Sequence, residues 1–360
     1  MRVLTAGICL LASLGALAAP APRFPPGALW YQDISAAPVD AASAQMISTL
    51  DGLGGWGLGR MQIDFSFHVR QIAAGENPAR LPLQAHPDGY YLPDCDPLSI
   101  LVPVPADAAF EGQDGLACDN GNEDCHLLVV EGSVLYELYA ANLVDGYLQT
   151  MCLARWDLAR IYPPQGRGEH CTSADAAGFP IAALLPNADG VAAAVNVPDG
   201  DLGQAIRFVL PNARMASDAS LGGISGRLYV RPATHAGGPS GPAASVPYGA
   251  RLRLRADFNL AGYPPAARVI LRTLQRYGMV LADGGDVALT FESDRHTTTK
   301  WDELDIGPHT FWNGTNGNRT PVQVADFAVI DTGARIAETY DCARTPIEPG
   351  QALFADGFEP

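Results

Sequence analysis

The stretch Cys125-His-Leu-Leu-Val-Val-Glu-Gly-Ser-Val-Leu-Tyr-Glu-Leu-Tyr139 decides the fold of this chain. Two runs of apolar and β-branched residues flank a glycine, which is the composition of a β-hairpin. A two-residue loop that begins at Glu131 would place His126 opposite Glu137, whereas a loop one residue later would place it opposite Tyr139. Because strand side chains alternate between two faces, both registers put these three side chains on the same face.

Short apolar runs of this kind recur along the chain, and 38 glycines and 29 prolines separate them. Many strands joined by turns are expected from this pattern. The strands are expected at residues 127–130, 134–139, 148–153, 205–210, 227–231, 252–258, 287–291 and 322–330. We therefore predict a mainly β protein with a β-sandwich-like two-sheet core, long loops and a few packed helices, in a single globular domain over residues 19–342.

One helix is clearly marked. Pro264 and Pro265 are suited to its start, Gly278 is suited to its end, and the apolar residues between them repeat at helical spacing. A second helix is expected over residues 41–50, with Asp40 as its N-cap.

The N-terminus has the layout of a secretory signal peptide over residues 1–18. A basic start at Arg2 precedes an apolar run, and Ala16 and Ala18 supply the small residues that signal peptidase reads. The run is shorter than the roughly 20 residues of a membrane span, so we expect no membrane anchor and a secreted or periplasmic protein. Residues 343–360 are expected to form a flexible tail.

The cysteines agree with export. Removal of the signal peptide takes Cys9 away and leaves an even number, which in an exported chain indicates disulfides. These six are Cys95, Cys118, Cys125, Cys152, Cys171 and Cys342. The expected pairing is Cys118–Cys125, Cys152–Cys171 and Cys95–Cys342, although six cysteines allow fifteen pairings. Zinc is the rival interpretation, but the chain has no Cys-x-x-Cys pair.

The formal net charge is −16, and it becomes −17 when Arg2 leaves with the signal peptide. Such a charge excludes general nucleic-acid binding, which needs a basic surface. The chain also lacks the motifs Gly-x-x-x-x-Gly-Lys, His-Glu-x-x-His and Gly-x-Ser-x-Gly, which disfavours nucleotide enzymes, zincins and α/β-hydrolases.

His126 and Glu137 form the leading candidate site. A histidine and a carboxylate on one strand face are an acid–base pair or the beginning of a metal site, or else a structural contact beside a cleft. The same-face neighbours Leu135 and Tyr139 would remove Glu137 from water and raise its pKa, as a general acid requires.

Asp175 is the second candidate carboxylate. It lies in the segment Thr172-Ser-Ala-Asp-Ala-Ala-Gly178, which is expected to be a short capped helix that a disulfide at Cys171 would hold in place. The segment is explained by capping alone, or it positions Asp175 at a site.

Three residues are expected to contact substrate. Tyr139 shares the strand face of the candidate acid, His235 begins a loop after a strand, and Arg253 lies on a strand face with two further arginines. These arginines would bind carboxylates of a ligand or be neutralised by the protein itself. The five tryptophans could stack on sugars or belong to the core. No cofactor is predicted, although the oxygen-rich residues 119–124 would allow calcium binding without the spacing of an EF-hand.

Several of these segments resemble an uncharacterised group of secreted bacterial proteins. The resemblance rests on residues 126–130, 135–139, 172–178, 248–251 and 276–278. The ending Phe-Ala-Asp-Gly-Phe-Glu at residues 354–359 resembles the tails of exported proteobacterial proteins. The resemblance implies export and carries no activity.

Together the features favour a secreted, monomeric polysaccharide-active enzyme. We predict a glycoside hydrolase that uses paired carboxylates, or a polysaccharide lyase. The alternative is a non-catalytic extracellular glycan-binding or surface protein. A third hypothesis is a metal site formed by His126, Glu137 and His235.

Overall fold

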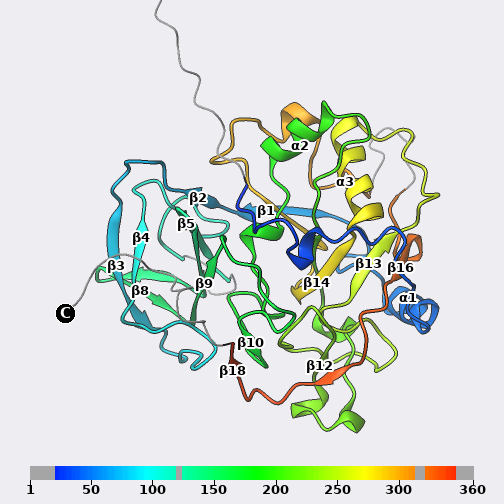
Figure 1. Cartoon of the computed structure of the whole chain (residues 1–360), viewed down its shortest axis with the longest axis horizontal. Coiled ribbons are helices and arrows are strands. Elements are labelled where there is room, and N and C mark those ends of the chain that lie inside the picture. Colours follow the sequence, from blue (N-terminus) through cyan, green and yellow to red (C-terminus); the bar gives the residue numbers. More distant parts are fainter. Residues whose placement is uncertain (1–20, 119–123, 313–320, 346–360) are drawn as a thin grey trace, which may run out of the picture.

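The computed structural model describes residues 21–118, 124–312 and 321–345. The predicted signal peptide, most of the oxygen-rich stretch 119–124 and residues 346–360 of the predicted tail lie outside these described residues. The chain forms two β-rich regions that lie side by side in Figure 1, one with a six-stranded sheet and helices, the other with two four-stranded sheets.

The six-stranded sheet is mixed, with both parallel and antiparallel pairs. Its order is β1 (Ile63–Phe67), β15 (Leu289–Glu292), β11 (Ile206–Leu210), β14 (Met279–Gly284), β13 (Arg251–Leu254) and β16 (Phe327–Val329). The two central strands, β11 and β14, run parallel and are apolar over most of their length, as expected for strands covered on both faces.

Three α-helices pack on this region (Figure 1). They are α1 (Ser43–Gly52), α2 (Ala188–Val195) and α3 (Pro265–Arg276). The prediction for α3 is confirmed: Pro264 is its N-cap, Pro265 is its first residue, and Gly278 has the left-handed conformation (φ +67°) beyond its end. In α1 the N-cap is Ala42, and Asp40 instead accepts a hydrogen bond from the Ala42 amide.

The second region contains two four-stranded sheets. One has the order β2 (Val69–Gln71), β5 (Leu127–Glu131), β6 (Val134–Tyr139) and β9 (Cys152–Asp157). The other has the order β4 (Leu101–Val104), β3 (Ala79–Ala85), β8 (Tyr147–Thr150) and β7 (Asn142–Val144). Two small pairs complete the strands: β10 (Gly168–Glu169) with β18 (Ala343–Arg344), and β12 (Leu228–Tyr229) with β17 (Ile336–Ala337).

Short 3₁₀ helices occupy several of the connections. They are η1 (Leu29–Tyr31), η2 (Ala182–Leu184), η3 (Asn212–Arg214), η4 (Ala219–Leu221), η5 (Ile224–Gly226), η6 (Asp302–Leu304) and η7 (Val324–Asp326).

The predicted hairpin is strands β5 and β6, and its sheet is buried on both faces. Leu127 and Val129 contribute to a small core between the two four-stranded sheets, whereas Leu128 and Val130 contribute to the large core that extends under the six-stranded sheet. The pairing of Glu131 with Val134 places the turn at the second of the two expected positions. The mainly β fold with a two-sheet core is thus confirmed, and its central sheet is a partition between two cores.

Some expected strands differ from the observed ones. The run 148–153 is divided at Met151 between β8 and β9, which belong to different sheets. The expected short helix at residues 172–178 is a series of turns, and the predicted tail boundary at residue 343 falls within β18. The prediction did not include strands β1 to β4, β7, β10, β14, β17 and β18, because short strands with mixed neighbours lack a clear period.

The six cysteines form three disulfides, of which Cys118–Cys125 was predicted. The other two predicted pairings are wrong: the bonds are Cys95–Cys152 and Cys171–Cys342. The physical reason is strand pairing between segments far apart in sequence. The pairing of β10 with β18 aligns Gly168 with Arg344 and thereby brings Cys171 to Cys342.

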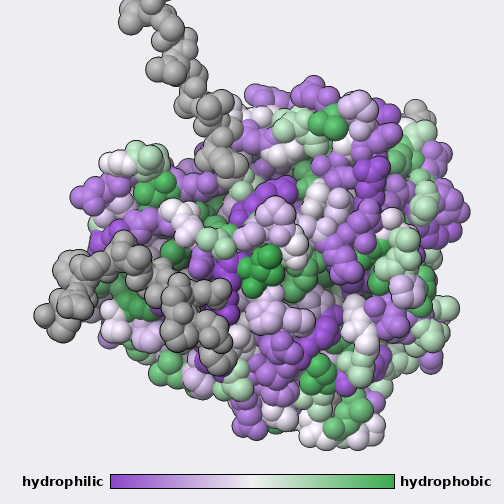
Figure 2. Space-filling view, viewed as in Figure 1, coloured by the Kyte–Doolittle hydropathy of each residue, from purple (hydrophilic) through white to green (hydrophobic). Residues whose placement is uncertain are grey.

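On the face of the molecule drawn in Figure 2, hydrophilic residues are widely spread and hydrophobic residues are scattered between them. Among the described residues, none of the helices combines the length and the apolar character needed to cross a bilayer.

Candidate functional site

A cleft of about 850 Å³ is the main hollow of the described structure. One wall comes from the region of the four-stranded sheets and carries Tyr90, Tyr91 and Tyr139. The opposite wall carries His235 and Tyr340. Polar groups among aromatic side chains in a concave site are typical of ligand-binding clefts.

Asp283 lines the floor of the cleft, near the end of β14. Its side chain is 22% exposed, and its two oxygens accept hydrogen bonds from the backbone amides of Gly284 (2.7 Å) and Ala176 (3.1 Å). Burial, followed by repulsion from Asp175, raises the pKa of Asp283 to about 7. A carboxyl group that stays protonated to neutral pH and reaches a cleft is suited to general acid catalysis.

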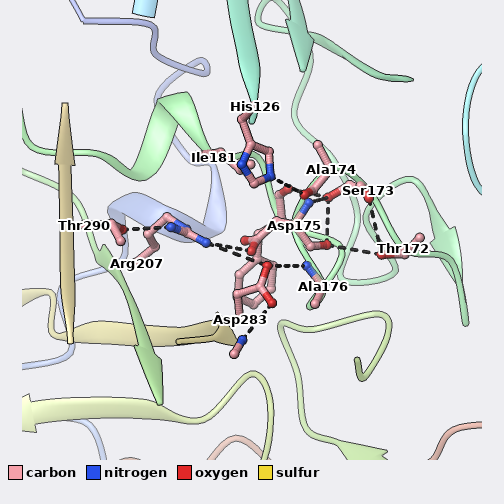
Figure 3. A network of polar contacts seen from close by, with 12 residues as sticks. His126, Thr172, Ser173, Ala174, Asp175, Ala176, Ile181, Arg207, Asp283 and Thr290 are labelled. Atoms are coloured by element: carbon pink, nitrogen blue, oxygen red, sulfur yellow. Dashed lines mark hydrogen bonds and ion pairs between the residues drawn. The ribbon is translucent and has the colours of Figure 1, made fainter. Parts of the chain in front are cut away.

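Directly behind this carboxyl group lies a buried ion pair (Figure 3). Arg207, from β11, donates to Asp175 Oδ1 at 3.0 Å and to Thr290 Oγ1 at 2.8 Å. The same Arg207 Nη2 lies 4.0 Å from Asp283 Oδ2. Burial raises the pKa of Asp175, whereas Arg207 opposes the rise. Since the guanidinium is closer to Asp175, we assign the negative charge to Asp175 and the proton to Asp283.

Residues 171–178, which we call the Cys171 loop, hold the polar groups of the floor. The Ala176 amide donates to Asp283, and the Ala176 carbonyl accepts a hydrogen bond of 2.7 Å from His235 Nδ1. The Ala177 amide donates to the Ala282 carbonyl, which ties the loop to β14. One residue therefore orients both an acid and a histidine toward the cleft.

The loop can follow this path only with glycine at position 178. Gly178 has φ +77°, and a Cβ there would lie 2.1 Å from Thr234 Oγ1 and 2.7 Å from the Cys171 carbonyl oxygen. Thr234 uses that hydroxyl to donate to the same carbonyl and thereby fixes the loop to the segment of His235.

His235 is oriented by its hydrogen bond and by Tyr340. Its ring stacks on Tyr340 with a centroid distance of 5.0 Å and an interplanar angle of 22°. Donation to the Ala176 carbonyl places a proton on Nδ1, so Nε2 is the acceptor whenever the ring is neutral. Asp283 Oδ2 and His235 Nδ1 bind the amide and the carbonyl of the same residue, Ala176. The backbone bonds between that amide nitrogen and that carbonyl oxygen total about 4 Å, so with the two hydrogen bonds the atoms lie within about 10 Å of each other.

Tyr340 is carried by the C-terminal strap, which we define as residues 336–345. Its hydroxyl accepts a hydrogen bond from Arg227. The strap is held at its start by β17, at its end by β18, and between them by Cys342, whose partner begins the Cys171 loop. Buried Glu338 adds hydrogen bonds from the amides of Ala236 and Tyr340.

The opposite wall presents a second aromatic pair. Tyr91 and Tyr139 are nearly parallel, with a centroid distance of 6.5 Å and an interplanar angle of 17°. Asp124 lies beside them and is exposed to the cleft. Burial raises the pKa of Asp124, and the charge of His126 opposes the rise.

Glu137, the predicted acid, lies behind the cleft and has no exposed surface. Its carboxylate accepts hydrogen bonds from Trp156 Nε1 (3.0 Å) and from the amides of Ile181 (2.8 Å) and Ala182 (2.8 Å). Burial raises the pKa of Glu137 to about 7, as its apolar neighbours led us to expect. The three donors make it a tether for η2, and no substrate reaches it in this arrangement.

His126 pairs with a carboxylate, but the partner is Glu111. His126 Nδ1 lies 2.6 Å from Glu111 Oε2, and Nε2 donates to the Ala174 carbonyl at 3.0 Å. Burial disfavours the charged ring, but Glu111 outweighs it and raises the pKa of His126 to about 9. His126 is thus a buried cation that holds the Cys171 loop at Ala174 (Figure 3).

The other predicted site residues divide between the cleft and the surface. Tyr139 and His235 line the cleft. Arg253 does not: it donates to the carbonyls of Ser35 (3.0 Å) and Ala37 (2.9 Å). Asp175 is fully buried beneath Asp283. Four tryptophans are core residues, Trp312 is half-buried, and tyrosines provide the aromatic faces of the cleft.

The sequence reasoning missed Asp283. Its signal is the segment Ala282-Asp-Gly-Gly-Asp286, in which an acid follows an apolar run and precedes two glycines. Ligand sites form at the carboxyl ends of parallel strands, but the parallel pairing of β14 with β11 was not evident.

Residues that could hold a metal are few within the described ranges. Asp94, Cys171 and Cys342 lie close together, but both cysteines are engaged in one disulfide. His126, Glu137 and His235 have the separate partners given above and form no common ligand set among the described residues.

No protein-family model matches this chain, and neither a curated protein nor a solved structure is similar to it.

Proposed function

We propose that the protein is a secreted, monomeric glycoside hydrolase that cleaves a polysaccharide in this cleft. The observation that carries the proposal is Asp283, a cleft-lining carboxyl group with a pKa of about 7. The three disulfides support an oxidising compartment such as the cell exterior or the periplasm.

Asp283 takes the role of general acid, which was predicted for Glu137 from the sequence. A general acid must protonate the oxygen of the departing sugar, so its proton has to be present at the working pH and exposed to the substrate. Two backbone amides fix the orientation of Asp283, and its burial, together with repulsion from Asp175 behind it, raises its pKa.

Asp124 is the second carboxylate of the proposal. A hydrolase needs one about 5–10 Å from the acid, as nucleophile or as the base that activates water. Asp124 lines the same cleft, and an electrostatic interaction between the two carboxyl groups supports their proximity. Asp124 is exposed to the cleft, whereas Asp283 is more deeply buried and lies beside the charge of Asp175, so Asp124 is the better candidate for the ionised role.

The walls supply the sugar contacts. Aromatic faces at Tyr91 and Tyr340 allow stacking on sugar rings. His235 Nε2 is an acceptor for a sugar hydroxyl, and the exposed Asn212 offers an amide group at the rim.

The test is a panel of polysaccharides assayed both for new reducing ends and for unsaturated products. Wild-type protein should release reducing ends without unsaturation, and Asp283→Asn should lower the rate by about 100- to 10 000-fold, the usual contribution of a general acid. Glu137→Gln is the matched control, because it replaces a buried carboxyl group outside the cleft. It should lower the melting temperature and leave the rate per folded molecule nearly unchanged.

Three outcomes would overturn the assignment. An Asp283→Asn variant with full activity would remove the proposed acid. Unsaturated products would indicate a lyase. Binding of a glycan by wild-type protein without any product would favour the non-catalytic glycan-binding protein.

A further inference from the structure

The charges that line the cleft are unequally distributed. Among the described residues, four carboxyl groups line it: Asp94, Asp124, Asp286 and Asp283, of which Asp283 holds a proton. Among the described lining residues, Arg227 is the one arginine, and there is no lysine. The cations behind the floor are neutralised by their own partners, since Arg207 pairs with Asp175 and His126 pairs with Glu111.

The single arginine is engaged with the strap. Arg227 donates to the Tyr340 hydroxyl and lies over its ring, with the guanidinium carbon 5.4 Å from the centroid. It is thereby held against the wall. Asp286, in contrast, is exposed and has no hydrogen-bond or ion-pair partner among the residues that the structure describes.

The aromatic pairs give the cleft a second property. Tyr91 and Tyr139 on one wall, and His235 with Tyr340 on the other, line the same cleft as Asp94, Asp124 and Asp286. Ring faces bind sugar rings by stacking, and they also attract ammonium groups.

We propose that the cleft selects sugar chains that carry free amines, binds neutral chains less tightly and excludes chains that carry carboxylates or sulfates. The inference rests on the cleft of the proposed function and names its substrate class. Carboxylates within a concave site focus a negative potential into it, so a cation is attracted before any specific contact forms. An ammonium group in the cleft then contacts both carboxylates and aromatic ring faces. The carboxylate of a uronate would be repelled by the carboxylates of the cleft, and the described part of the lining has no free arginine to pair with it.

The experiment measures binding, independently of turnover. Soluble oligosaccharides of equal length, α-1,4- and β-1,4-linked, are titrated calorimetrically at pH 6 in three forms: hydroxyl-bearing, deacetylated amine-bearing and carboxyl-bearing. The expected order of affinity is amine, then neutral, then carboxyl. The preference for the amine form should weaken between 20 mM and 500 mM salt, because screening reduces charge attraction.

Asp286→Asn is the informative variant, since Asp286 lies outside the catalytic groups proposed above. It should weaken binding of the amine-bearing chain about three- to five-fold, the effect of one partly exposed charge pair, and leave the neutral chain unchanged. Asp257→Asn is the matched control, because its side chain is 81% exposed and lies outside the cleft. It changes the net charge equally and should alter neither affinity.

The inference is overturned if the carboxyl-bearing chain binds most tightly, if no amine-bearing chain binds, or if Asp286→Asn and Asp257→Asn behave alike. Its failure is distinguishable from that of the hydrolase assignment. The expected charge order without any cleavage would refute the hydrolase alone, whereas cleavage of acidic chains that depends on Asp283 would refute the charge preference alone.

Discussion

Replacement of Asp175 by asparagine tests whether a buried charge sets the proton affinity of Asp283. The substitution keeps the size of the side chain and removes its negative charge. Asp175 Oδ1 and Asp283 Oδ2 share Arg207 Nη2, at 3.0 and 4.0 Å, so the two oxygens lie no more than about 7 Å apart.

The expected change follows from Coulomb's law. Two unit charges about 7 Å apart at an effective dielectric constant of about 20 repel by roughly 2 kcal/mol, which corresponds to a pKa change of roughly 1 to 2. The repulsion disfavours the ionised form of Asp283, so its removal lowers the pKa. The pKa of Asp283 should therefore fall from about 7 to between about 5 and 6 in Asp175→Asn.

Two measurements report this change. Carbon NMR of protein labelled at aspartate carboxyl groups follows the titration directly, and Asp283→Asn identifies the resonance. On an active substrate, a general acid works while it holds its proton, so activity is present below its pKa and is lost as the pH rises through it. The alkaline limb of the pH profile should move to lower pH in Asp175→Asn by the same amount.

Asp96→Asn is the control for structural damage, because Asp96 is also buried and bonded to arginines, Arg167 at 2.9 Å and Arg344 at 3.1 Å. It should destabilise the protein without moving the titration of Asp283. The reasoning is refuted if the Asp283 titration stays near pH 7 in Asp175→Asn or moves upward, or if Asp96→Asn moves it equally.

Two further predictions concern stability and the strap. Replacement of both Cys171 and Cys342 by serine should destabilise the protein by roughly 2–4 kcal/mol and weaken glycan binding, because the strap that the bond holds carries an aromatic wall of the cleft; unchanged affinity in the folded variant would contradict this role. The pair of His126 and Glu111 should stabilise the fold fully below the unfolded histidine pKa of about 6.5, and this contribution should be lost as the pH rises through about 9. Urea unfolding at pH 6, 8 and 10 measures it, and Glu111→Gln should flatten the trend.

The hairpin was predictable because its information is local. Alternation of apolar side chains and a glycine turn specify β5 and β6, and the proline pair and Gly278 specify α3. The burial of Glu137 was also correctly expected. The structural role of Glu137 was not predictable, because the large core and η2 cover the strand face that carries it. A sequence shows that a strand face is apolar, but not what covers it.

The candidate site depends on contacts between distant segments, and this limits prediction. His126 and Glu111 are separated by 15 residues, Asp175 and Arg207 by 32, and Ala176 and Asp283 by 107. No local period specifies such meetings. The two wrong disulfide predictions have the same cause, because the observed bonds join cysteines that are 57 and 171 residues apart.

The Cys171 loop positions both Asp283 and His235 in the cleft. The acid Asp283 and His235 bind the amide and the carbonyl of the same residue, Ala176, so a small displacement of the loop moves both hydrogen-bond partners together. His126 holds the loop at Ala174, and the strap disulfide fixes its start at Cys171. The position of Asp283 relative to His235 therefore depends on the backbone geometry of Ala176, which is far stiffer than a contact between two separate loops. Such stiffness is what an acid needs when it must meet one particular oxygen of a bound chain.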